Sequence, residues 1–149
     1  MKGQNDQEMT QVIQELSPRL PRIEEQMTQG RYQEAAWNLC EWFGQVAQVK
    51  AQHGEWFANM LHGGEVSDMV FMTDAAAELY CHLRQLPSLP KALGEEMDHR
   101  LEALNRKTKL FGDWTVNIYA DMLYVYGYQS EDYSDLQQLE TWNDWKENH

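Results

Sequence analysis

The sequence predicts an all-α protein, a single-domain bundle of about five to seven helices joined by short loops. Three observations predict this fold class. Apolar residues recur at a period of three to four, most such segments begin at residues that cap helices, and no stretch alternates apolar and polar residues over the length of a strand. The 149 residues suit one domain, and the hydrophobic fraction of 42% is enough for a core.

The first predicted element is an interrupted helix. A capping box at residues 5–8 precedes an apolar stripe, and Pro18 and Pro21 fall within it. Because a proline removes a backbone donor, we expect a kink or a fresh helix start there, with Ser17 as N-cap. Gly30 is expected to end this element.

The next helix, from Tyr32 to about Lys50, has apolar residues over one half of its helical wheel and polar residues over the other. The seven residues 30–36, with their glycine, aromatic and alanine, resemble the turn between the two helices of a tetratricopeptide repeat. No second copy follows at a period near 34. The resemblance therefore implies a helical hairpin and not a repeat array.

Five more helical segments follow along the chain. The expected ranges are 55–61, 67–86, 90–110, 114–126 and 134–145, each bounded by a capping residue, a glycine or a proline. The segment at 114–126 is apolar almost all round. We expect it to be the central helix, packed on two sides.

The charge of the chain is strongly negative and uneven. Asp and Glu number 24 against 12 Lys and Arg, and residues 113–149 hold eight acids against one cation, together with eight of the 17 aromatic residues. A net charge of −12 repels nucleic-acid backbones and anionic membranes, so we expect direct binding to neither. Clustered carboxylates and aromatic rings favour recognition of a basic protein partner.

The sequence also predicts the cellular location of the protein and the redox state of its two cysteines. The first residues contain no apolar signal-peptide run, and no 18 uncharged apolar residues follow one another. These observations predict a cytoplasmic protein. Cys40 and Cys81 are too few for a disulfide framework and are not spaced as zinc ligands, so they are expected to be reduced.

A metal site is the main catalytic alternative. Asp74, Glu78 and His82 share one stripe of a helix, and Glu96 with His99 has the Glu-x-x-His spacing of carboxylate-bridged dimetal bundles. That template needs two such pairs and two further glutamates, and the sequence has one pair. We therefore expect solvated polar faces, no metal, no cofactor and no enzyme activity, with a metal-dependent helical hydrolase as the alternative.

The predicted function is that of a non-enzymatic acidic module that binds another protein. We expect an inhibitor, of immunity or anti-defence type, that docks an acidic and aromatic surface on a basic site of its partner. A structural subunit or adaptor of a larger assembly is the alternative, and a homodimer is open. Trp37 falls in the polar half of its helix, which makes it either a rim contact to the next helix or a partner-binding anchor.

The predicted partner-binding residues lie mainly in the C-terminal quarter of the chain. Trp142 and Trp145 are three residues apart and widen the apolar face of the last helix. We therefore expect one of them to stay accessible after this helix has packed on the bundle. The full predicted set is Trp37, Asp121, Tyr124, Tyr126, Tyr128, Glu131, Asp132, Tyr133, Asp135, Trp142 and Trp145.

Overall fold

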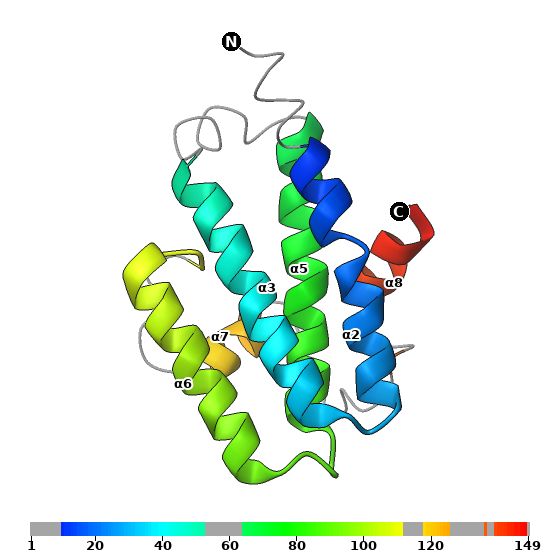
Figure 1. Ribbon diagram of the computed structural model, residues 1–149, viewed down its shortest axis with the longest axis vertical. Helices are drawn as coiled ribbons and strands as arrows, with labels where there is room; N and C mark the ends of the chain where they lie inside the picture. The colour runs from blue at the N-terminus through cyan, green and yellow to red at the C-terminus, as the bar shows by residue number, and fades with distance from the viewer. Residues whose placement is uncertain (1–9, 53–63, 112–117, 126–135, 137–138, 149) are drawn as a thin grey trace.

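The computed structural model describes residues 10–52, 64–111, 118–125, 136 and 139–148 (Figure 1). The helices with defined bounds are α2 (Arg19–Thr28), α3 (Tyr32–Gln52), α5 (Gly64–Gln85), α6 (Lys91–Thr108), α7 (Ile118–Val125) and α8 (Glu140–Asn148). Residues 10–16 form a further helical segment ahead of α2, and the described residues contain no strand. The predicted all-α bundle of five to seven helices is confirmed.

The break before α2 follows from its prolines. The chain turns at Ser17 and Pro18, and Pro18 is the N-cap of α2, one residue later than predicted. Pro21 falls in the first turn, where a backbone N–H has no helical acceptor in any case. The capping box at residues 5–8 and the segment at 55–61 lie outside the described residues.

Gly30 shapes the tight turn between α2 and α3. Its φ of 77° lies in the left-handed region, which a glycine adopts without steric cost. The N–H of Gly30 donates to the carbonyl of Met27 at 3.2 Å, and the N–H of Arg31 donates to that of Gln26 at 2.9 Å. These two bonds form a Schellman motif, and α3 starts immediately afterwards.

The helices α3 and α6 lie side by side and run in the same direction (Figure 1). At their starts, Tyr32 Oη lies 2.6 Å from Ser88 Oγ, just before α6. At their ends, Lys50 Nζ donates to the carbonyls of Lys109 at 3.3 Å and Leu110 at 3.2 Å. The parallel arrangement leaves a seam along both helices, from the turn after Gly30 to the last turn of α6.

The central helix is α5, not the segment at 114–126. Every residue from 75 to 83 is buried, and α5 contacts α2, α3, α7 and α8. The described part of 114–126 is α7, which packs on α5 and α6 through Ile118 and Met122 but leaves Tyr124 77% exposed. Three successive alanines, 75–77, let neighbouring helices approach α5 closely on more than one side.

The burial of α5 corrects the prediction of a solvated polar face. Glu78 is 1% exposed and His82 is 3% exposed, while Asp74 is half-buried. The prediction was wrong because it set these residues opposite an apolar face, whereas residues 75–83 of α5 are buried on all sides.

The last helix starts later than predicted. Leu139 is not helical, and α8 begins at Glu140 instead of near residue 134. Leu139 is buried, and its N–H donates to the carbonyl of Leu136 at 3.2 Å. The contact between Leu136 and Leu139 therefore precedes the first residue of α8.

Candidate functional site

Trp37 lies on the α3–α6 seam and is half-buried. The guanidinium carbon of Arg100, from α6, lies 3.8 Å from the centroid of its ring, which is a cation–π contact. Arg100 also donates to Glu96 Oε1 at 3.3 Å. Trp37 therefore contacts a neighbouring helix, and its role as a partner-binding anchor stays a prediction.

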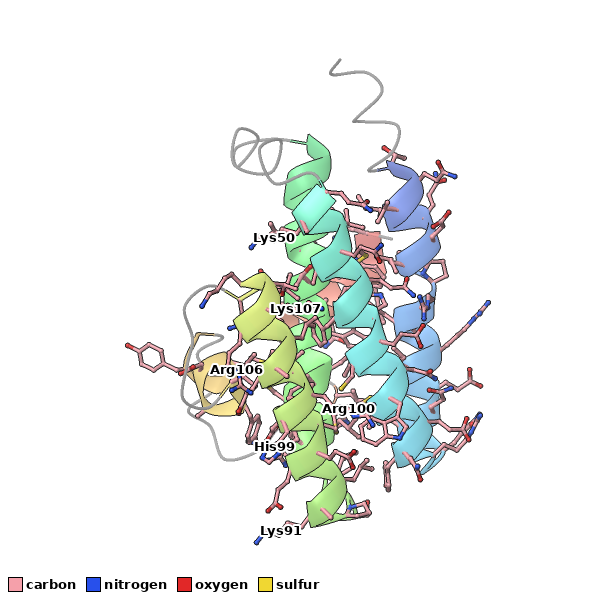
Figure 2. All side chains as sticks on the ribbon, turned by 60° about the vertical axis from the view of Figure 1, so that its left-hand side comes forward. Lys50, Lys91, His99, Arg100, Arg106 and Lys107 are labelled. Carbon is pink, nitrogen blue, oxygen red and sulfur yellow. The ribbon has the colours of Figure 1, made fainter. Side chains whose placement is uncertain are left out.

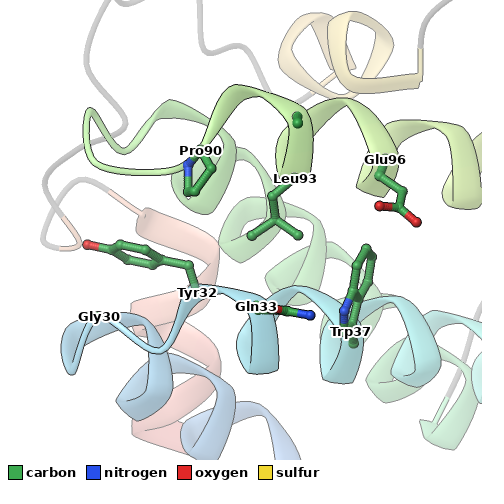
Figure 3. A pocket seen from close by; sticks show the side chains of 8 residues that line it. Gly30, Tyr32, Gln33, Trp37, Pro90, Leu93 and Glu96 are labelled. Atoms are coloured by element: carbon green, nitrogen blue, oxygen red, sulfur yellow. The ribbon is translucent and has the colours of Figure 1, made fainter.

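Two pockets flank Trp37 along the seam. The pocket nearer the start of both helices has a volume of about 480 Å³ and is lined by Gly30, Tyr32, Gln33, Trp37, Pro90, Ala92, Leu93 and Glu96 (Figure 3). The second has a volume of about 440 Å³ and is lined by Trp37, Cys40, Glu41, Gly44, Arg100, Leu101 and Leu104. Trp37 lines both, so its indole separates one pocket from the other. We call this surface the Trp37 groove.

The first pocket is apolar and aromatic with one charged group. Its walls are formed by the rings of Tyr32 and Trp37 and by Leu93, and Glu96 is the only charged residue in its lining. Arg100 lines only the second pocket. The first pocket therefore combines two aromatic rings with a carboxylate and contributes no cation.

The second pocket contains a thiol that is poorly suited to nucleophilic chemistry. Burial raises the pKa of Cys40 to about 12. At neutral pH the thiol is protonated, and the thiolate is the reactive form. Neither Cys40 nor Cys81 forms a disulfide in the structure.

A buried polar network joins α5, α6 and α7 behind the groove. Arg84 Nε and Nη2 donate to Asp98 Oδ2 at 3.1 and 2.8 Å, and Tyr80 donates its hydroxyl proton to Asp98 Oδ1. The guanidinium of Arg84 also lies 4.5 Å from the ring centroid of Tyr119. Burial and the adjacent Asp98 carboxylate raise the pKa of Tyr80 well above its usual range. This network links the three helices and was not predicted.

Cations gather where α3 and α6 end. Arg106 and Lys107 lie in the last turn of α6, next to Lys109 and to Lys50 from α3 (Figure 2). Cations in the last turn of a helix are stabilised by its macrodipole, and this effect explains their position.

The two C-terminal tryptophans are buried, which contradicts the expected accessibility of one of them. Trp142 is 0% exposed and Trp145 is 2% exposed, and their rings stack with centroids 5.5 Å apart. The indole N–H of Trp142 donates to the Glu24 carboxylate, which also lies 3.3 Å from Lys146 Nζ. These aromatic rings attach α8 to the bundle and offer little surface to a partner.

Two other predicted partner-binding residues can be placed. Tyr124 is largely exposed on α7, and Asp121 of the same helix is partly exposed. They lie on a different element from the Trp37 groove. The remaining predicted residues, Tyr126, Tyr128, Glu131, Asp132, Tyr133 and Asp135, lie outside the described residues.

The residues of the metal alternative do not form one site. Glu96 and His99 are exposed on α6 (Figure 2), whereas Glu78 and His82 are buried within α5. In the part of the chain that the structure describes, no three His, Cys, Asp or Glu side chains are grouped so as to hold a metal ion.

Comparison of the chain with protein-family models, curated proteins and solved structures finds no match. Among the described helices, none combines the length and apolar character needed to cross a membrane. The Trp37 groove is the candidate functional site of the described residues.

Proposed function

We propose that the protein is a non-enzymatic binding module whose Trp37 groove docks on a basic site of a partner protein and inhibits that partner by covering the site. The position of Trp37, half-buried between two adjoining pockets, carries the proposal. Tryptophan is enriched among the residues that dominate binding energy at protein interfaces. A rigid indole beside two concavities is suited to such a contact.

The charge of the molecule supports a basic partner. A net charge of −12 attracts a positively charged surface over long range and raises the association rate. The groove contributes the short-range contacts, through Leu93 and Pro90 in one pocket and Leu101 and Leu104 in the other. Long-range charge and local apolar surface together favour recognition over catalysis.

Affinity capture with matched variants tests the proposal. The wild-type protein, Trp37→Ala and Tyr124→Ala are immobilised, and proteins captured from lysate of the source cells are identified by mass spectrometry. We expect one basic protein that the wild type and Tyr124→Ala capture equally and that Trp37→Ala loses, while circular dichroism shows all three folded. Equal capture by Trp37→Ala would place the interface away from the groove.

Purification of the captured partner tests the inhibitor role directly. Its own activity should fall as the wild-type protein is added and should persist with Trp37→Ala. Association should also slow as salt rises, because screening weakens the attraction. Salt-independent binding with no loss of partner activity would instead support a structural subunit or adaptor.

A further inference from the structure

We propose that the first pocket of the Trp37 groove binds an arginine side chain of the partner, stacked on the side of the indole away from Arg100. The inference rests on the proposed protein-binding function and adds the chemistry of the residue that is recognised. Pocket shape, charge and an intramolecular precedent support it.

The precedent is the contact with Arg100. Its guanidinium lies 3.8 Å from the Trp37 ring centroid and 3.3 Å from Glu96, so this indole and this carboxylate already hold one guanidinium. Arg100 lines the second pocket and not the first. The first pocket therefore offers the same tryptophan and the same glutamate without an internal cation in its lining.

The rest of the first pocket suits the stem of a long cationic side chain. The ring of Tyr32 lies across the pocket from Trp37, with its hydroxyl fixed 2.6 Å from Ser88 Oγ (Figure 3). Pro90 and Leu93 supply apolar surface between the two rings. The methylene groups of an incoming side chain can pack there while its charged end reaches the indole and the carboxylate.

Glu96 offers a cation a carboxylate at the end of the pocket farther from Arg31 and Lys91, the chain neighbours of Gly30 and Pro90. Glu96 accepts from Arg100 through Oε1, and no described residue donates to Oε2, which can accept from a second guanidinium. Helix macrodipoles disfavour a cation mainly within the first turn. Trp37 and Glu96 both lie beyond the first turns of α3 and α6.

Arginine fits the pocket better than lysine for two reasons. Its planar guanidinium stacks on an aromatic face and donates to a carboxylate edge at the same time, whereas an ammonium group acts as a compact, strongly hydrated point charge. The Arg100 contact shows this stacking on the same indole.

Three short peptides test the inference: acetyl-Gly-Arg-Gly-amide, its lysine analogue and its citrulline analogue, which has nearly the shape of arginine without the charge. Each is titrated into the full-length ¹⁵N-labelled protein, and the indole N–H signal of Trp37 is assigned from its loss in Trp37→Phe. We expect millimolar binding of the arginine peptide, weaker binding of the lysine peptide, and binding of the citrulline peptide weaker by about tenfold or more. Equal affinity for arginine and citrulline would overturn the inference.

Variants separate an aromatic contact from simple packing. Trp37→Phe keeps an aromatic face and should retain part of the arginine affinity, whereas Trp37→Leu keeps apolar bulk and should lose it, as read from backbone amide shifts in α6. Glu96→Gln should weaken binding several-fold, and Val70→Ala, an exposed position on α5, should leave it unchanged. Unaltered affinity in a folded Trp37→Leu variant would place arginine elsewhere.

The two proposals fail separately. If Trp37→Ala loses the captured partner but the arginine peptide does not shift the Trp37 signal, the binding function stands and the arginine inference falls. If the arginine peptide binds but partner capture does not depend on Trp37, the pocket chemistry stands and the proposed interface falls.

Discussion

Replacement of Asp98 by alanine tests whether the buried polar network stabilises the bundle. Asp98 is the common acceptor for Arg84 and Tyr80, and the side chains of Arg84 and Asp98 are only 19% and 12% exposed. Removing one member of a buried ion pair leaves the other charge without its partner and costs about 3–5 kcal/mol. Because both groups keep some contact with solvent, we expect the lower end, about 3 kcal/mol.

The effect is large enough to measure by denaturation. In a protein of this size 1 kcal/mol shifts the melting temperature by about 2–4 °C, so the variant should melt about 6–12 °C below the wild type. Urea titrations followed by far-ultraviolet circular dichroism give the free energy of unfolding. A second variant, Arg84→Met with Asp98→Leu, should recover much of the loss, because it leaves neither charge buried alone.

An exposed ion pair supplies the matched control. Arg100 and Glu96 have side chains 54% and 56% exposed, and such pairs contribute about 0–1 kcal/mol. Glu96→Gln should therefore change the free energy of unfolding by less than about 1 kcal/mol. If Asp98→Ala costs no more than this control, the network does not stabilise the fold and the reasoning is refuted.

Three further predictions concern other parts of the bundle. The native pKa of Cys40, about 12, exceeds the usual value of 9.0, so the native state binds more protons than the unfolded state between these pH values. The free energy of unfolding of the wild type should therefore fall as pH rises from 9 toward 12, by up to about 1.4 kcal/mol per pH unit. Cys40→Ala lacks this thiol, so between about pH 8 and 10 its free energy of unfolding should fall less than that of the wild type. Trp142→Ala should lower the free energy of unfolding by about 3–5 kcal/mol in urea titrations, yet leave partner capture intact at temperatures where the variant is folded. Gly94→Ala should destabilise despite a gain in helix propensity of about 1 kcal/mol, because the added Cβ would lie 2.6 Å from Nη1 of Arg84, whose Nε and Nη2 are held by Asp98; greater stability by urea titration would contradict this.

Several elements followed from local sequence signals. The bounds of α3 and α6 lie within about two residues of those predicted, because Gly30, Pro90 and regular apolar stripes mark them. The helical wheel also placed Trp37 in the polar half of α3, and it left open whether the side chain contacts a neighbouring helix or a partner. The stacking of Trp37 with Arg100 could not be predicted, because this contact depends on the parallel packing of two helices that are far apart in the chain.

Other features could not be read from one helix at a time. Glu78 and His82 fall on the polar face of a helical wheel, yet neighbouring helices cover them. The pairing of Asp98 with Arg84 and Tyr80 joins positions 14 and 18 residues apart on two helices. Burial of Trp142 and Trp145 likewise depends on Glu24 and α5, which sequence spacing does not relate to α8.

The enclosure of α5 has a consequence for how the protein opens to solvent. The backbone amides of residues 75–83 are hydrogen-bonded within a helix whose side chains are buried on every side. Their exchange with deuterium requires removal of the surrounding helices, so the slowest of them should exchange at the rate set by global unfolding. One wall of the Trp37 groove is α3, which buries seven residues in the same core, so that wall should share the protection of α5 and present a fixed surface to a partner.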